Sequence, residues 1–266
     1  MNALRLYGRY ASVSLRSQLQ YRASVIMQSI GIFMITSIEF LGIWALFDRF
    51  GQIRGWTLPE VALFYGMISI SWALCDAFAR GFEVAGQIIK AGDFDRILLR
   101  PRSTVLQMLG YELTVRRIGR LVQGVVVLGY AIVALDIDWN VPRVLLLVAA
   151  IAGTICVFMG LVVFQATASF WTTETMELFN SFTYGGVTMA QYPLAIYRGW
   201  FRRLFTFVIP LGCGNYLPAL AILGREDPLG TPAAVQWVAP LAGPAFLGIA
   251  LLVWRIGIRH YRSTGS

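Results

Sequence analysis

The stretch VIMQSIGIFMITSIEFLGIWALF, residues 25–47, is apolar over nearly its whole length. Its only charged residue is Glu39. A helix needs about 20 apolar residues to cross the hydrocarbon core of a bilayer. The stretch therefore predicts a membrane-spanning helix rather than a core helix of a soluble domain.

Long apolar runs of the same kind recur along the chain. Apolar residues make up 57% of the sequence and charged residues 14%, against about 25% charged in a typical soluble domain. We predict an all-α membrane protein with six transmembrane helices. The run at 175–195 is the least apolar and is rich in small residues, which suits a helix packed inside the bundle. The five spans after the first are expected at about 59–79, 117–135, 143–168, 175–195 and 238–258.

Residues 1–24 precede the first span and have a basic, amphipathic pattern. Such a helix lies in the membrane interface with its arginines toward anionic headgroups, although a plain soluble helix has the same pattern. The long apolar run that follows directly favours the interfacial position. On the helix, Arg5, Arg9, Ser12 and Arg16 fall on one side, and Leu4, Tyr7, Ala11 and Leu15 fall on the other.

The net charge is +8 at pH 7, and the basic residues are unevenly divided among the predicted loops. Most of them fall before the first span, between the second and third spans, and after the sixth span. Positive residues collect on the cytoplasmic side of membrane proteins. We therefore expect a multi-pass protein of the cell (inner) membrane with both termini in the cytoplasm. Its basic residues are expected to meet membrane lipids and not nucleic acid.

The loop between the second and third predicted spans contains AGDFDRILLRPRST, residues 91–104, a charged segment in an otherwise apolar chain. Gly92 breaks the preceding helix, Asp93 is suited to cap a new one, and Pro101 disfavours helix at the residue before it. This element fits either a protein partner or a loop packed on its own bundle with arginines on lipid phosphates. We expect about two helical turns, with Phe94, Ile97 and Leu98 on one side and Arg96 and Arg100 on another.

The basic N-terminal helix, the six spans and this charged helix resemble the permeases of ABC type 2 exporters. The resemblance extends over the whole chain and includes AGDFDRILLRPRS, FTFVIPLGCGNYLPAL at 205–220 and VWRIGIRHYRSTGS at 253–266. In that family the first cytoplasmic loop, here about 82–104, carries a coupling helix that docks in a groove of a separate ATPase subunit. The resemblance implies a docking knob of Phe94, Ile97 and Leu98 and a charged rim of Asp93, Asp95, Arg96 and Arg100.

The resemblance also implies partners and cofactors. Such exporters combine two permeases, identical or related, with two ATPase subunits that bind ATP and Mg²⁺. The chain has no P-loop pattern GxxxxGK[ST], since its one lysine, Lys90, is followed by Ala and Gly. We therefore expect neither a cofactor nor a catalytic residue in this chain. With one histidine, His260, and no CxxC pair, we also expect no metal site.

Residues 196–236, between the fifth and sixth predicted spans, are broken by prolines and glycines. Broken backbone at membrane depth is tolerated only where protein shields it or where it lines a watery cavity. The resemblance implies outer re-entrant helices that cap the exit of the path and suit an amphiphilic cargo; the alternative is a structural plug. Candidate path or gate residues are Glu39, Asp76, Glu174, Glu177, Trp200 and Phe205.

Three classes of function remain open, and the permease subunit of an ATP-driven exporter, which the resemblance implies, ranks first. An ion-coupled secondary transporter would need recurring charges within the spans and inverted repeats, and neither is clear in the sequence. A membrane enzyme acting on lipid would need a cluster of acids, histidines or metal ligands. The closest acid pairs, at 93–95 and 136–138, are predicted on opposite faces of the membrane.

Overall fold

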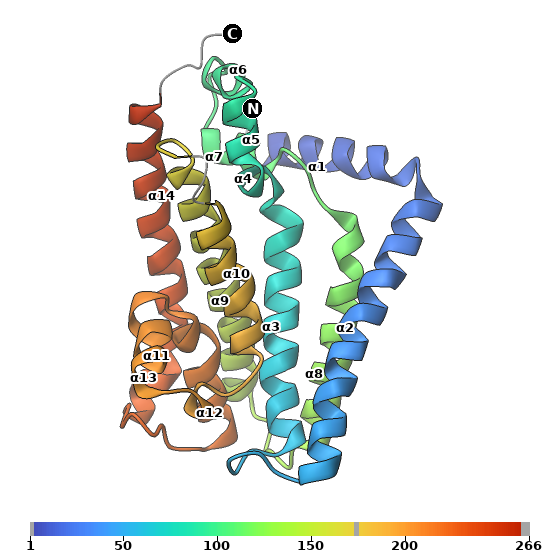
Figure 1. The fold of residues 1–266 in the computed structure, drawn as a ribbon, viewed down its shortest axis with the longest axis vertical. Coiled ribbons are helices and arrows are strands. Elements are labelled where there is room, and N and C mark those ends of the chain that lie inside the picture. Colours follow the sequence, from blue (N-terminus) through green and yellow to red (C-terminus); the bar gives the residue numbers. More distant parts are fainter. Residues whose placement is uncertain (1–2, 173–175, 262–266) are drawn as a thin grey trace.

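The computed structural model describes the backbone of residues 3–172 and 176–261 of the 266-residue chain. Within these ranges every regular element is helical, apart from one isolated β-bridge between Ile53 and Trp56. The long helices run side by side, and the short helices gather at the two ends of the bundle (Figure 1). The prediction of an all-α protein is confirmed.

Five helical segments of the described ranges are long and apolar enough to cross a bilayer. They fall at the first, second, third, fourth and sixth predicted spans, so the chain is a multi-pass membrane protein. These are α2 (Arg22–Phe50), α3 (Leu58–Phe78), α8 (Ile118–Ala134, after a 3₁₀ turn at Val115–Arg117), α9 (Val141–Ala168), and α14 (Ala242–His260), which α13 (Ala233–Val238) precedes.

The fifth predicted span, at 175–195, is not confirmed. α10 (Met176–Ala190) lies there and packs against α9, but it has 15 residues. At about 1.5 Å per residue it extends roughly 22 Å, less than the roughly 30 Å of a hydrocarbon core.

A bent helical pair follows α10 and takes the place predicted for re-entrant helices. Its first arm is α11 (Gly199–Arg203) with a π-helical turn, and its second arm contains another π-helical turn and α12 (Leu217–Leu223). The arms meet at 86° across a break that contains Pro210. The pair is either one broken span, which would make six, or a re-entrant hairpin. It lies at the end of the bundle opposite α1 (Figure 1).

α1 (Ala3–Leu19) runs across the other end of the bundle, called the α1 end below (Figure 1). The Ser14 hydroxyl accepts a hydrogen bond from the backbone N–H of Leu113 at 2.9 Å, and the Gln18 side chain accepts one from Val115 at 3.1 Å. The inward face of α1 is therefore polar as well as apolar, unlike the predicted division into a basic and an apolar side. The three predicted interfacial arginines are exposed: Arg5, Arg9 and Arg16.

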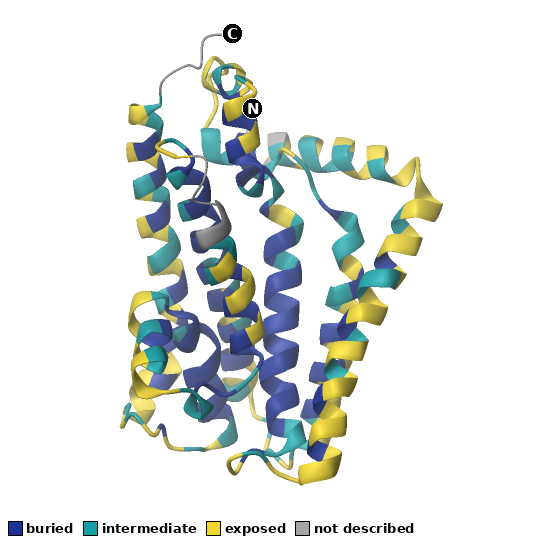
Figure 2. Ribbon diagram, in the orientation of Figure 1, coloured by how far each residue is buried: buried dark blue, intermediate teal, exposed yellow. Residues whose placement is uncertain are grey.

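α3 is the most deeply buried span and stands at the centre of the bundle, between α8 and α9 (Figure 2). Glycines set how closely the neighbouring helices approach. A Cβ atom on Gly66 of α3 would lie 2.8 Å from Leu128 of α8, and one on Gly119 of α8 would collide with the carbonyl oxygen of Ser29 of α2. Small residues at helix crossings are the usual means of close packing in membranes.

α2 is the least covered span of the structure. Its buried residues are Ser29, Thr36, Ile43 and Phe47, which form one narrow stripe at helical spacing. The rest of the helix is partly or fully exposed (Figure 2). An apolar surface of this kind faces either lipid or another membrane protein.

We predict that Gly119→Ala lowers the thermal midpoint of the protein purified in detergent. The added methyl group forces α8 away from α2, and overpacking of this type costs about 1–3 kcal/mol. Gly129→Ala is the matched control, because it lies on the same helix and its Cβ would meet nothing within 4 Å. The packing argument is wrong if the two variants have the same midpoint.

Candidate functional site

The loop between α3 and α8 folds into four short helices at the α1 end. These are α4 (Arg80–Glu83), α5 (Ala85–Lys90), α6 (Phe94–Leu98) and α7 (Thr104–Leu109). We call residues 91–104 the arginine-rich segment.

Two residues at the start of the arginine-rich segment set its direction. Gly92 has a φ of +75°, a left-handed conformation that favours glycine, so the chain turns there before α6 begins. The predicted helix cap at Asp93 is not present, since its side chain makes no capping hydrogen bond. Its carboxylate pairs instead with Arg96 at 3.4 Å, and both side chains are largely exposed.

Phe94 is fully buried, so the prediction that it forms part of an exposed knob is wrong. Its ring lies 5.2 Å from that of Phe170, which follows α9, and 6.1 Å from that of Trp254 of α14. The rings of Phe82 and Tyr261 complete the group. We call these five side chains the aromatic anchor. Each such ring pair contributes about 0.5–1.5 kcal/mol beyond the burial of its area.

Hydrogen bonds, together with the aromatic anchor, fix the arginine-rich segment to the bundle. The indole N–H of Trp254 donates to the Thr104 hydroxyl at 3.1 Å. The amide of Gln107 donates to the carbonyl oxygen of Ile97 at 3.0 Å. Burial, together with the nearby Asp95 carboxylate, raises the pKa of Tyr261 to about 12, so its hydroxyl stays protonated. The arginine-rich segment is therefore fixed to α14 and to the end of α9.

The part of the segment that faces away from the bundle is apolar at its tip. Leu98 is 39% exposed and Leu99 is 84% exposed, whereas Ile97 is half-buried. Arg96 and Arg100 are exposed on either side of these leucines. We call Leu98 and Leu99 the segment tip. The sequence analysis did not predict the exposure of Leu99, because it assigned Phe94 to the exposed apolar side instead.

A cluster of ion pairs lies beneath the short helices. The buried carboxylate of Asp76, near the end of α3, pairs with Arg117 at 2.6 Å. Arg80 pairs with Glu83 at 3.3 Å and approaches Glu112 at 3.9 Å. Burial, and then the charge of Asp76, raise the pKa of Glu83 to about 7.

A polar cavity of about 180 Å³ opens next to this cluster, between α3, α9 and α10. Arg80 and Glu83 line it, and so do Gln165 and Asn180, which are joined by a hydrogen bond of 3.1 Å. The ring of Tyr184 stands edge-on to that of Trp72 at 5.3 Å on another wall. The cavity can accept polar groups where the loop helices α4 and α5 meet α3, α9 and α10.

The candidate path residues do not come together in one site. Glu39 is exposed on α2, and Asp76 belongs to the ion-pair cluster. Trp200 is exposed on α11, whereas Phe205 is buried against Phe201 at 4.7 Å between ring centres. Glu174 lies outside the described residues, and so does the side chain of Glu177.

The opposite end of the bundle is tied by an ion pair that the sequence analysis missed. Arg225 pairs with the buried Glu60 at 2.6 Å and lies over the ring of Trp56 at 4.3 Å. Glu60 also completes a capping box with Thr57 at the start of α3. These contacts join the loop before α3 to the loop after α12.

Among the residues that the structure describes, no group of three or more histidines, cysteines and acids is placed to hold a metal ion. What the geometry defines is a multi-pass membrane protein with a firmly anchored, solvent-facing loop helix and a polar cavity between its spans.

The chain belongs to the ABC-2 family of transporter proteins, whose family model matches residues 33–265. It is therefore an ABC transporter permease, the membrane subunit of a system whose family implies an ABC ATPase subunit as its partner. Membership of this family favours the permease over the two other classes, the ion-coupled secondary transporter and the membrane enzyme acting on lipid. No curated protein and no solved structure matches the chain.

We predict that Arg117→Gln destabilises the protein, because it leaves the buried Asp76 charge without its partner. Breaking a fully buried pair costs roughly 3–5 kcal/mol. Arg117 keeps 26% of its side-chain surface exposed, so we expect about 1–3 kcal/mol, seen as a lower thermal midpoint in detergent.

Two controls distinguish the loss of the Asp76–Arg117 ion pair from the general effect of removing one positive charge. Combining Asp76→Asn with Arg117→Gln should recover most of the lost midpoint. Arg116→Gln alters the neighbouring arginine, which bonds the exposed Gln28, and should change the midpoint little. A normal midpoint for Arg117→Gln would mean that the pair adds nothing to stability.

Proposed function

We propose that this permease is the transmembrane subunit of an ATP-driven exporter and that its ATPase partner docks on the segment tip. The observation that carries the proposal is the exposure of Leu98 and Leu99 on a loop helix whose other large apolar residues are buried or half-buried. Burying a leucine side chain contributes about 1.5–3 kcal/mol. An apolar patch rimmed by polar residues can mark a partner site, and arginine is enriched at protein interfaces.

Coupling in this proposal depends on the aromatic anchor. Because Phe94 packs on Phe170 and Trp254, a displacement of the segment tip moves the ends of α9 and α14 with it. The predicted coupling residues then divide by role. Phe94 and Ile97 fix the segment to the bundle, Leu98 meets the ATPase, and the charged rim consists of Asp93, Asp95, Arg96 and Arg100.

The partner ATPase supplies the chemistry, with ATP and Mg²⁺ bound on two copies of that subunit. The α1 end faces the cytoplasm in this arrangement, with both termini on that side. α1 then lies in the membrane interface with Arg5, Arg9 and Arg16 toward anionic headgroups. The bent pair of α11 and α12 lies at the outer end, where it closes the path for an amphiphilic cargo.

A second permease, identical or related, covers the exposed face of α2. Glu39 lies in the middle of that span and is exposed, and an ionisable side chain facing hydrocarbon is costly. Such residues nearly always face protein or a watery cavity. The position of Glu39 thus supports a path bounded by α2 and a neighbouring permease.

We predict that Leu99→Asp abolishes ATPase docking while the permease still folds. A carboxylate at the centre of an apolar contact must lose its water on binding, which should reduce the recovered ATPase subunit at least tenfold. The measurement is purification of the tagged permease from its native membranes, with mass spectrometry for a subunit that has a P-loop and an assay of ATP hydrolysis.

Leu99→Met is the control, because it keeps an apolar side chain of similar size. It should retain the ATPase subunit. The thermal midpoint of the isolated Leu99→Asp permease should equal that of the wild type. If Leu99→Asp retains normal amounts of active ATPase, the docking surface lies elsewhere.

We further predict that a cysteine at Ile35, one turn before Glu39 on the exposed face of α2, cross-links to a second permease in native membranes. Thr36→Cys is the control, because this neighbouring position is buried within the chain. The size of the cross-linked product distinguishes an identical from a related partner. Equal cross-linking of both variants, or of neither, would contradict the proposed interface.

A further inference from the structure

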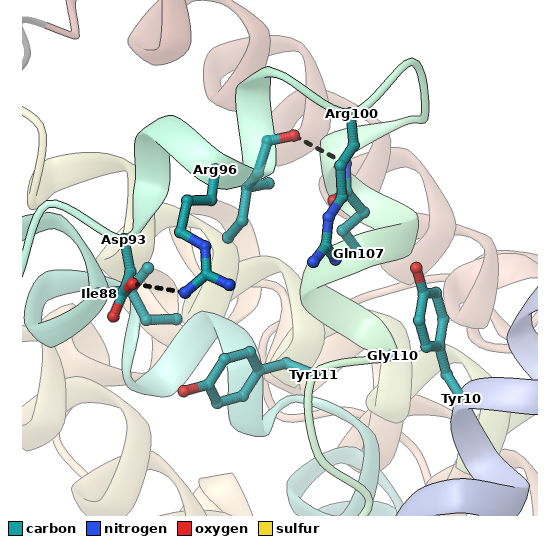
Figure 3. Close-up of a pocket in the computed structure, with 9 residues that line it drawn as sticks. Tyr10, Ile88, Asp93, Arg96, Arg100, Gln107, Gly110 and Tyr111 are labelled. Carbon is teal, nitrogen blue, oxygen red and sulfur yellow. Dashed lines mark hydrogen bonds and ion pairs between the residues drawn. The ribbon is translucent and has the colours of Figure 1, made fainter.

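A cavity of about 320 Å³ separates α1 from the arginine-rich segment (Figure 3). Tyr10 of α1 lines one wall, and Arg96 and Arg100 of the segment line another. Gln107 and Tyr111 also line it. The two arginine side chains extend from the segment toward the level of the tyrosine rings (Figure 3). Neither docking of the ATPase nor the polar cavity between the spans accounts for this space.

The charge of the cavity lining favours an anion. Arginine is always protonated, and its planar guanidinium binds phosphate oxygens in pairs. The opposing carboxylate, Asp93, meets Arg96 in an exposed pair at 3.4 Å, a kind of contact that adds little stability. None of the ion pairs formed between described residues includes Arg100. A phosphate can therefore be bound without breaking a strong contact.

Gln107 supplies a second sign that the cavity takes a ligand. The residue is 94% buried, and its amide N–H group donates to the carbonyl oxygens of Ile97 and Arg102. The amide oxygen of Gln107 is buried without a hydrogen-bond partner. A buried acceptor left unpaired costs about 1–3 kcal/mol. Because this oxygen has almost no accessible surface, a ligand hydroxyl group next to the phosphate satisfies it once the Gln107 side chain turns toward the cavity.

The position of α1 indicates where that ligand comes from. A Cβ atom on Gly110 would lie 2.6 Å from the ring of Tyr10, so Tyr10 is seated directly on the backbone at Gly110. One wall of the cavity thus belongs to a helix that runs across the ends of the spans (Figure 1), the helix that we place in the membrane interface under the proposed function. A phosphodiester attached to a lipid can reach the arginines from the membrane surface.

We propose that this cavity binds the phosphodiester headgroup of an anionic phospholipid that also carries a hydroxyl group. Arg96 and Arg100 bind the phosphate, the hydroxyls of Tyr10 and Tyr111 donate to it, and the amide oxygen of Gln107 accepts from the lipid hydroxyl. The bound lipid joins α1 to the arginine-rich segment. The site forms in the permease alone, and its two arginines, Arg96 and Arg100, also belong to the charged rim of the proposed docking surface.

The test is thermal unfolding of the purified full-length permease in detergent with dihexanoyl phosphatidylglycerol, dihexanoyl phosphatidylcholine or inorganic phosphate. We expect phosphatidylglycerol to raise the midpoint in a saturable manner and the other two to raise it much less. The double variant Arg96→Gln/Arg100→Gln should have at least about tenfold lower affinity for phosphatidylglycerol. Both side chains are exposed, so its midpoint without lipid should match the wild type.

Arg102→Gln is the matched control, because this exposed arginine of the same segment does not line the cavity. It should bind phosphatidylglycerol with wild-type affinity. Leu99→Asp, the variant that tests ATPase docking, should do the same. An equal response to phosphatidylcholine, or normal phosphatidylglycerol affinity in the double variant, would overturn the proposal. If inorganic phosphate raises the midpoint as much as phosphatidylglycerol does, the cavity binds a free anion, and the proposal of a lipid ligand is overturned.

Discussion

The packing of Phe94 against Phe170, Trp254 and Tyr261 is the contact on which this account of the permease depends. A short loop helix has little stability of its own, because its few backbone hydrogen bonds do not offset the entropy of ordering it. The aromatic anchor supplies that stability from outside the helix. It also determines which spans the helix is joined to, since Trp254 belongs to α14 and Phe170 follows α9.

Charged and apolar contacts are found in different parts of the bundle. The spans pack through glycines and buried apolar surface, whereas charged contacts gather near the two ends. Asp76 with Arg117 lies near the α1 end of α3, and Glu60 with Arg225 lies at the other end of the same helix. The central span α3 is therefore tied by ion pairs at both ends and by close packing between them.

The sequence predicted the class of fold and five of the spans, because hydropathy averaged over about 20 residues is a strong signal. It predicted the arginine-rich segment but reversed the side on which Phe94 lies. Helical spacing shows which residues share a face, and only the tertiary packing shows which face is buried. Arg117 and Arg225 were missed for a related reason, since their acidic partners lie far away along the chain. The short length of α10 was also missed, because the run at 175–195 was taken as one helix although Pro193 lies within it.

The most direct test of the central claim is a distance measurement between the arginine-rich segment and α14. Spin labels at Arg102 and Ile256, both exposed, would be introduced after the native cysteines are replaced, and the distance measured with and without nucleotide-bound ATPase. The account predicts one narrow distance that is the same in both states, because the aromatic anchor keeps segment and span together. A broad distribution, or a shift on nucleotide binding, would mean that the segment moves independently of α14.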